Sequence, residues 1–125
     1  MKKIINTNDA PAAIGPYSQA TVTEDLLFTS GQLGIDPSTG ELEDSINSQV
    51  KRAIENAGAI LKAANLSYEN VVKTTCFLTD MKNFAAFNSI YAEYFKHNPA
   101  RSCVEVSALP KGALFEIELI ASREK

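Results

Sequence analysis

The sequence predicts a protein of mixed α and β structure, in which two α-helices cover one face of a β-sheet. Strand-like and helix-like segments follow one another in the order strands, helix, strand, helix and two strands. With 125 residues, of which 45% are hydrophobic, the chain suits one domain, residues 1–125, with its own core. Because two helices can cover only one sheet face, the second face must be solvated or covered by another subunit.

The N-terminal part of the chain predicts an ordered loop, a short strand and a turn. Residues 9–20 contain two prolines and a glycine, a composition that favours an ordered loop over a helix. Residues 26–31 begin with an apolar run that ends at a glycine, which is typical of a short buried strand. Residues 36–40 read Asp-Pro-Ser-Thr-Gly, which predicts a turn.

The first helix is predicted over residues 45–64. Its apolar residues recur with the helical period, and a helix of this length is about 30 Å long. Either Asp44 or Ser45 can cap its N-terminus, and Asn65 can adopt the left-handed conformation that ends it. Residues 71–79 are rich in β-branched side chains and predict a strand.

The second helix is predicted from about residue 81 to residue 95, with Asp80 as its cap. Its apolar stripe is aromatic and consists of Phe84, Phe87, Tyr91, Tyr94 and Phe95. A strand over residues 101–108, a turn at 109–112 and a last strand over 114–121 complete the chain.

The last two strands each present two different faces, because successive side chains of a strand alternate. Arg101, Cys103 and Glu105 point to one side of their strand, and a set that includes two valines points to the other. On the last strand we assign the Phe115 side to the helices and Glu116 to the second face of the sheet.

The composition disfavours several functional classes. The net charge is −3 and the 12 basic residues are scattered, whereas nucleic-acid binding requires clustered positive charge. There is no 18-residue apolar stretch for a membrane span and no signal peptide, so we expect a cytoplasmic protein. Cys76 and Cys103 are then free thiols in a reducing compartment, and a single histidine argues against a zinc site.

Arg101 is the strongest candidate for ligand binding. Its planar guanidinium suits bidentate recognition of a carboxylate or phosphate, although an exposed or ion-paired arginine is the alternative. Cys103 lies roughly 6.6 Å further along the same face. Its thiol could be a nucleophile with a lowered pKa, but a pocket-lining or filler role is favoured because no histidine lies nearby in the sequence.

Four further residues are candidates for the same site. Glu116 lies among apolar residues and could position or deprotonate water, but it could equally be a solvated glutamate like Glu118. Asn88 falls inside the aromatic stripe, where a buried amide would either contact a ligand or tie the helix to a loop. Tyr17 and Ser30 lie beside proline or glycine at a loop and a strand end, positions that often face pockets.

Several segments occur together, and in this order, in one known family. They are Gly15-Pro16-Tyr17-Ser18-Gln19-Ala20, Ser30-Gly31-Gln32, Gln49 with Asn56, Val72-Lys73-Thr74-Thr75, Asn88 with Tyr91 and Phe95, Pro99-Ala100-Arg101-Ser102-Cys103-Val104-Glu105-Val106, Leu109-Pro110 and Glu116-Ile117-Glu118. On these segments the chain resembles the RidA/YjgF/YER057c/UK114 family over essentially its whole length, specifically the RidA-type enamine/imine deaminases. The most specific element is the Pro-Ala-Arg-Ser-Cys run joined to the late glutamate.

The resemblance implies a chorismate-mutase-like α+β fold, in which a mixed sheet carries two helices on one face. It also implies a homotrimer whose inner sheet faces form a barrel, with the sites in the clefts between subunits. By position, Arg101 resembles the arginine that grips the substrate carboxylate, and Glu116 resembles the acid that holds or activates water. The residues that resemble the pocket lining are Cys103, Ser30, Gly31, Tyr17 and Asn88.

The reaction implied by the resemblance is the hydrolysis of 2-aminoacrylate or 2-aminocrotonate, through their imine tautomers, to a 2-keto acid and ammonia. The expected ligands are small 2-imino and 2-keto carboxylates, and neither a metal nor a cofactor is expected. One alternative is a non-catalytic ligand-binding regulatory protein, which would need Arg101 but not Glu116. Another is an endoribonuclease or translation inhibitor, which the acidic composition disfavours.

Overall fold

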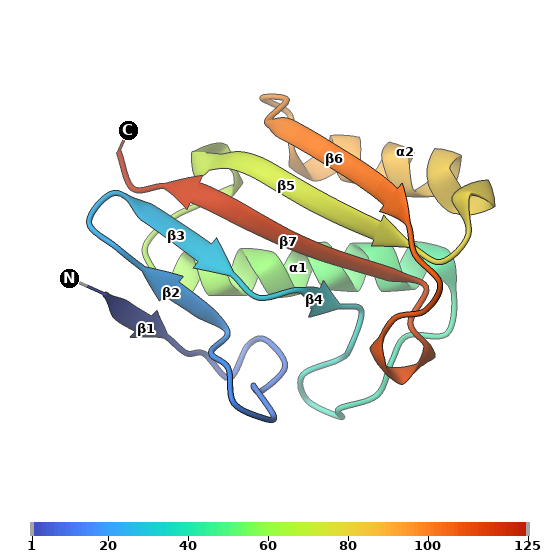
Figure 1. Ribbon diagram of the computed structural model, residues 1–125, viewed down its shortest axis with the longest axis horizontal. Coiled ribbons are helices and arrows are strands. Elements are labelled where there is room, and N and C mark those ends of the chain that lie inside the picture. The colour runs from blue at the N-terminus through green and yellow to red at the C-terminus, as the bar shows by residue number, and fades with distance from the viewer. Residues whose placement is uncertain (1, 125) are drawn as a thin grey trace.

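The strands of this protein form one mixed sheet, which the computed structural model describes over residues 2–124 (Figure 1). Its seven strands are β1 (Lys3–Ile5), β2 (Ala20–Val22), β3 (Leu26–Thr29), β4 (Gln32–Leu33), β5 (Val71–Leu78), β6 (Ala100–Glu105) and β7 (Phe115–Ser122). The strand order is β1-β2-β3-β7-β5-β6, and β4 also pairs with β7. β5 and β6 are parallel, and the other neighbouring pairs are antiparallel. The predicted mixed sheet is therefore confirmed.

The last strand of the chain, β7, lies in the middle of the sheet. It pairs with β3 and β4 on one side and with β5 on the other, so β5 separates β6 from β7. Along β7, Phe115 and Ile117 are fully buried whereas Glu116 is only partly buried and Glu118 is exposed. This alternation confirms that the Phe115 side faces the core and that Glu116 lies on the opposite sheet face.

The first helix, α1 (Ile46–Ala63), begins where a serine satisfies its free backbone donors. Ser45 is the N-cap, because its Oγ accepts a hydrogen bond from the backbone N–H of Ser48 at 3.1 Å. Past the C-terminus, Asn65 adopts the predicted left-handed conformation, with a φ of 62°. Of the two caps that the sequence left open, Ser45 fills this role.

The second helix and the strand after it are shorter than predicted. Residues 81–83 form a 3-10 turn capped by Asp80, and α2 spans Phe84–Tyr94. The strand predicted over residues 101–108 ends at Glu105, because its neighbour β5 ends at Leu78 and offers no further partner. The short strands β1, β2 and β4 were not predicted, because two or three residues cannot show a period of alternation.

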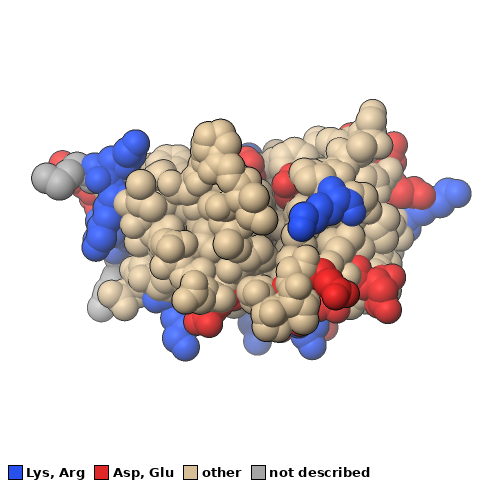
Figure 2. Space-filling model, turned by 90° about the horizontal axis from the view of Figure 1, so that it is seen from below, with Lys and Arg blue, Asp and Glu red and all other residues tan. Residues whose placement is uncertain are grey.

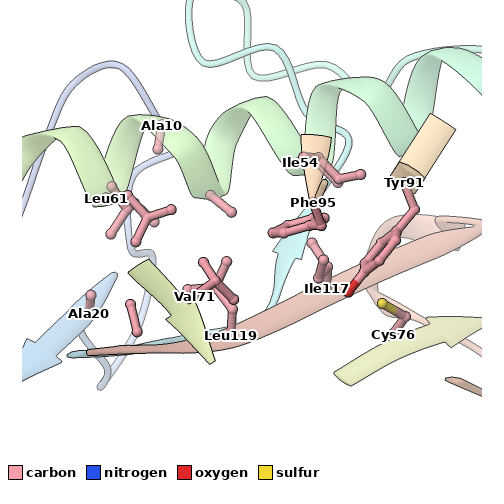
Figure 3. Packing of buried hydrophobic residues seen from close by; sticks show 14 of the residues in the cluster. Ala10, Ala20, Ile54, Leu61, Val71, Cys76, Tyr91, Phe95, Ile117 and Leu119 are labelled. Carbon is pink, nitrogen blue, oxygen red and sulfur yellow. The ribbon is translucent and has the colours of Figure 1, made fainter. Parts of the chain in front are cut away.

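Both helices pack on the same face of the sheet and enclose the core. Figure 3 shows Ile54 and Leu61 of α1 directed toward the sheet, where Ile117 and Leu119 of β7 lie opposite them. All four side chains are at most 2% exposed. Burial of such a side chain contributes roughly 1.5–3 kcal/mol, so this layer dominates the stability of the fold.

The opposite face of the sheet has no helix over it within residues 2–124 (Figure 1). It carries Phe28, Phe77 and Val104 from three different strands, together with Glu116. Phe28 is 39% exposed and Val104 is 45% exposed. We call this surface the open face. It is the second sheet face, which two helices were predicted to leave uncovered.

Candidate active site

A pocket of about 730 Å³ opens between three loops at one end of the sheet. The loops join β1 to β2, β4 to α1 and β6 to β7, and they gather at the lower edge in Figure 1. Figure 2 views the molecule from that side and shows a mostly uncharged surface, with a patch of positive charge inside its right half and other charged side chains nearer its margins. Tyr17, Ser30, Gly31 and Glu116 line this pocket, which we call the glutamate pocket.

Glu116 reaches the glutamate pocket from β7, where its register partners are Leu33 and Phe77. Its carboxyl is partly removed from water, and this burial raises its pKa above 4.5, with a smaller contribution from the negative charge of Glu118. A Cβ added to Gly31 would lie 2.5 Å from Oε2 of Glu116. Gly31 therefore leaves the space that the carboxylate occupies.

Tyr17 and Ser30 complete the rim of the glutamate pocket. Ser30 Oγ donates a hydrogen bond to the carbonyl oxygen of Ser18 at 2.6 Å, which ties the end of β3 to the N-terminal loop. Tyr17 is 53% exposed. Its backbone N–H donates to the carbonyl of Gly15, whose φ of 134° suits only glycine. The Tyr17 side chain is therefore accessible at the rim of the pocket.

Gln19 organises this loop, a role that the sequence analysis missed. Its side chain is 2% exposed, accepts a hydrogen bond from the N–H of Thr7 and donates to the carbonyls of Thr7 and Pro11. A buried amide with every polar atom satisfied holds an irregular segment in one conformation. The signal available in the sequence was a glutamine inside a Gly-Pro-Tyr-Ser-Gln loop, which carries no recognisable period.

Arg101 lies in a separate place, on β6 beside α2. Its Nη1 donates a hydrogen bond to Oδ1 of Asn88 at 2.7 Å. The prediction that Asn88 is buried is wrong, because it projects from the edge of α2 and is exposed. Its amide oxygen ties α2 to the guanidinium of Arg101 on β6, not to a loop as one alternative predicted, and the ligand contact stays a prediction. We call Arg101, Asn88 and Cys103 the arginine site.

Cys103 shares the sheet face of Arg101 and packs partly against the core. Its parallel neighbour on β5 is Cys76, whose pKa is raised by burial to about 12. Burial also raises the pKa of Cys103, and the nearby guanidinium of Arg101 opposes this only partly. A thiol held protonated in this way fits the favoured interpretation of a pocket wall rather than a nucleophile.

The arginine site and the glutamate pocket do not meet within one chain. On β5, Thr74 is the register partner of Arg101, whereas Phe77 is the partner of Glu116. Residues 74 and 77 are an odd number of steps apart, so their side chains and those of their partners point to opposite faces of the sheet. Arg101 therefore lies on the helix side and Glu116 on the open face.

Within residues 2–124, no group of three or more acidic, cysteine or histidine side chains is arranged to hold a metal ion. Over the same residues, neither helix combines the length and the apolar character that crossing a membrane requires.

Known proteins resemble this chain over nearly its whole length. The family model for endoribonuclease L-PSP matches residues 7–123. A human protein named 2-iminobutanoate/2-iminopropanoate deaminase is 48% identical over 123 residues, covering 97% of this chain and 90% of the relative. The crystal structure of E. coli TdcF with bound serine has a TM-score of 0.95 and 44% identity, and covers 98% of this chain and 99% of that chain.

A second solved structure, RidA from the Antarctic bacterium Psychrobacter sp., has a TM-score of 0.94 at 43% identity and covers 96% of this chain and 98% of that chain. The family match spans far more than half of the chain. In each comparison the alignment covers at least 90% of this chain and of the relative. The chain therefore belongs to the endoribonuclease L-PSP family, the RidA/YjgF family that its sequence segments predict.

Proposed function

We propose that this protein is a 2-iminobutanoate/2-iminopropanoate deaminase, which hydrolyses imines derived from small amino acids to 2-keto acids and ammonia. Two observations carry the proposal: Arg101, whose guanidinium is held by Asn88, and Glu116, a partly buried carboxyl of raised pKa in the glutamate pocket. The human relative named for this activity supports it. The serine bound to E. coli TdcF supports a small amino-acid-like carboxylate as the ligand.

The active site forms between two subunits of a homotrimer in this proposal. The register positions of Arg101 and Glu116 lie about 10 Å apart along β5 and about 10 Å apart across it, on opposite faces. A ligand with six or seven heavy atoms cannot span that distance through the sheet. The exposed apolar side chains of the open face, Phe28 and Val104, favour its coverage by other copies of the chain.

The chemistry divides between the two groups of residues. Arg101 of one subunit binds the substrate carboxylate and Asn88 holds its guanidinium in place. Glu116 of the neighbouring subunit takes a proton from a water molecule, whose oxygen attacks C2 of the imine. Glu116 then returns this proton to nitrogen, which gives a carbinolamine. In a second transfer through Glu116, the hydroxyl proton of the carbinolamine moves to nitrogen, the C–N bond breaks and ammonia leaves as the carbonyl forms. A raised pKa suits a carboxyl that must both accept and return a proton.

A coupled assay tests the function. A PLP-dependent serine or threonine dehydratase generates 2-aminoacrylate or 2-aminocrotonate, and release of pyruvate or 2-oxobutanoate is followed with and without this protein. We expect faster release with the wild type. We expect Glu116→Ala to lose turnover while retaining 2-keto acid binding, and Arg101→Ala to lose both.

Three outcomes would contradict the proposal. No acceleration by a folded, assembled wild type would exclude the deaminase. Tight 2-keto acid binding without turnover would favour the regulatory ligand-binding alternative. RNA cleavage that falls with salt and is abolished by Arg101→Ala would favour the endoribonuclease alternative.

A further inference from the structure

The guanidinium of Arg101 lies among the aromatic rings of α2. Its central carbon is 4.9 Å from the ring centroid of Tyr91, 5.3 Å from that of Phe87 and 5.6 Å from that of Phe84. These distances fall within the roughly 6 Å over which a ring face attracts a cation. The three rings, together with Asn88, occupy one side of α2 at helical spacing, so a single helix face surrounds the cation.

Tyr91, whose ring is nearest to Arg101, is itself fixed at its far end. Its hydroxyl lies 2.7 Å from Oγ1 of Thr74, and both residues are buried. Thr74 is also the neighbour of Arg101 across the β5–β6 ladder. Thr74 is therefore the strand neighbour of Arg101, and its side chain holds the ring against which the Arg101 guanidinium packs. Thr74, Tyr91 and Arg101 each contact the other two.

We propose that Tyr91, fixed by Thr74, is a positioning residue that holds the guanidinium of Arg101 ready for a carboxylate. The ring supports the cation without occupying an N–H donor. Within residues 2–124, the Arg101 side chain donates a hydrogen bond only to Asn88, which leaves its other N–H groups for a ligand. A preorganised guanidinium loses less conformational freedom on binding, so the ligand binds more tightly.

The hydroxyl pair keeps this support neutral and in one orientation. Burial raises the pKa of Tyr91, so the phenol remains protonated beside the cation instead of competing with the ligand as an anion. A buried phenol also needs a hydrogen-bond partner, and Thr74 supplies it. Without Thr74 the ring would have to tilt toward another partner and would leave the guanidinium unsupported.

The test compares the same substitution at two tyrosines of α2. Tyr91→Leu removes the ring beneath Arg101, whereas Tyr94→Leu removes a ring that packs edge-on against Tyr68 instead. We expect Tyr91→Leu to weaken 2-oxobutanoate binding in calorimetry about 5- to 30-fold and to raise KM equally. Because the carboxylate is bound alike in substrate and transition state, kcat should stay within about twofold. Tyr94→Leu should leave both constants within about twofold of the wild type.

The role of the hydroxyl pair is tested by conservative variants that are expected to fold. The double variant Thr74→Val with Tyr91→Phe removes both hydroxyls together, so neither is left without the other. It also removes the acceptor of the weak 4.0 Å hydrogen bond from the Cys76 thiol. We expect the double variant to raise KM about threefold, because the ring is held less firmly. The single variant Thr74→Ser keeps the hydroxyl and should retain the wild-type KM. An unchanged KM in the double variant would overturn the role of Thr74.

This inference rests on the proposed function only for the identity of the ligand, so a second measurement is independent of activity. The guanidinium NMR signals of Arg101, assigned through their loss in Arg101→Lys, report its mobility directly. We expect restricted rotation in the wild type and release in Tyr91→Leu but not in Tyr94→Leu. That pattern with an inactive wild type would reject the deaminase and keep the positioning role. An active wild type in which Tyr91→Leu changes neither KM nor these signals would reject the positioning role alone.

Discussion

Glu116 owes its raised pKa to its place on β7. The strand carries it onto the open face, where the carboxyl is only partly hydrated and Glu118 follows on the same side. Burial is the larger cause and the like charge the smaller one. The residue that is proposed to move protons is therefore also a residue whose ionisation weakens the fold.

The stability of the fold should depend on pH through Glu116. Its folded pKa is above the unfolded value, so its contribution is fully present below pH 4.5 and is lost as the pH rises through the folded pKa. We expect Glu116→Gln to gain stability relative to the wild type between pH 4.5 and neutrality and then to keep that gain. Denaturant midpoints at several pH values check this, and the same substitution at the exposed Glu69 controls for loss of a negative charge. A constant difference from pH 4 to 8 would contradict it.

Residue 31 should need to be glycine because the Glu116 carboxylate occupies the space of a side chain there, and not because of its backbone conformation. It is not among the glycines with positive φ, so alanine is opposed only by the carboxylate 2.5 Å from the added Cβ. We expect Gly31→Ala to displace the carboxylate and lower kcat about 100-fold or more. Binding of 2-oxobutanoate, which we propose that Arg101 provides, should change little. Retention of full kcat in a variant with an unchanged circular dichroism spectrum would argue against the assigned position of the acid.

At the scale of elements, helix ends and strand pairing set where the functional side chains lie. α2 lies between the parallel strands β5 and β6 in the chain, and this crossover brings its aromatic side to Arg101. β5 lies between β6 and β7, so Arg101 on β6 and Glu116 on β7 flank β5 on its two sides. The local sequence of each element predicts its type, but neither neighbour relation can be read from it.

The start of α1 offers a direct test of the observed cap. Ser45→Ala removes the acceptor for the N–H of Ser48 and should cost about 1 kcal/mol in the free energy of unfolding. Asp44→Ala should cost less, although the sequence alone allowed either residue as the cap. Chemical denaturation of the two variants compares them, and an equal or larger loss in Asp44→Ala would contradict the assignment of Ser45.

For the whole molecule, the central observation is that one sheet separates Arg101 from Glu116, the two residues that the proposed reaction needs. Arg101 faces the helix layer and Glu116 faces the open side, so a single chain presents both groups without joining them. In the proposed trimer, closed symmetry would resolve this, because each copy would offer its arginine to one neighbour and its acid to the other. The proposed trimer is thus a requirement of the proposed chemistry.

Subunit complementation tests this arrangement. Arg101→Ala and Glu116→Ala are each expected to be inactive alone. After the two are refolded together in equal amounts, a random mixture should place an intact arginine beside an intact glutamate in about a quarter of the sites. We therefore expect about a quarter of wild-type activity in the coupled assay. Activity that stays at background after confirmed subunit exchange would show that both groups act within one chain.

Several site residues were predictable from the sequence because their chemistry is local. Strand alternation correctly placed Arg101 with Cys103, and Glu116 opposite Phe115. The burial of Asn88 was wrong because helical period alone does not show which edge of the helix meets the sheet. Gln19 was missed because its partners are carbonyls of an irregular loop, whose path is not periodic.

The sequence by itself determined both helices, the longer strands, the side of the last strand that faces the core and the two residues that carry the proposed chemistry. The elements follow from the apolar periods of 3.6 residues in helices and two residues in strands, and the two site residues follow from the chemistry of their side chains. Only the tertiary structure decided that β5 lies between β6 and β7, that the Arg101 side rather than the valine side faces the helices, and that Tyr91 rests on Thr74 beneath Arg101. These relations depend on pairing and packing between distant segments, which local periodicity does not encode.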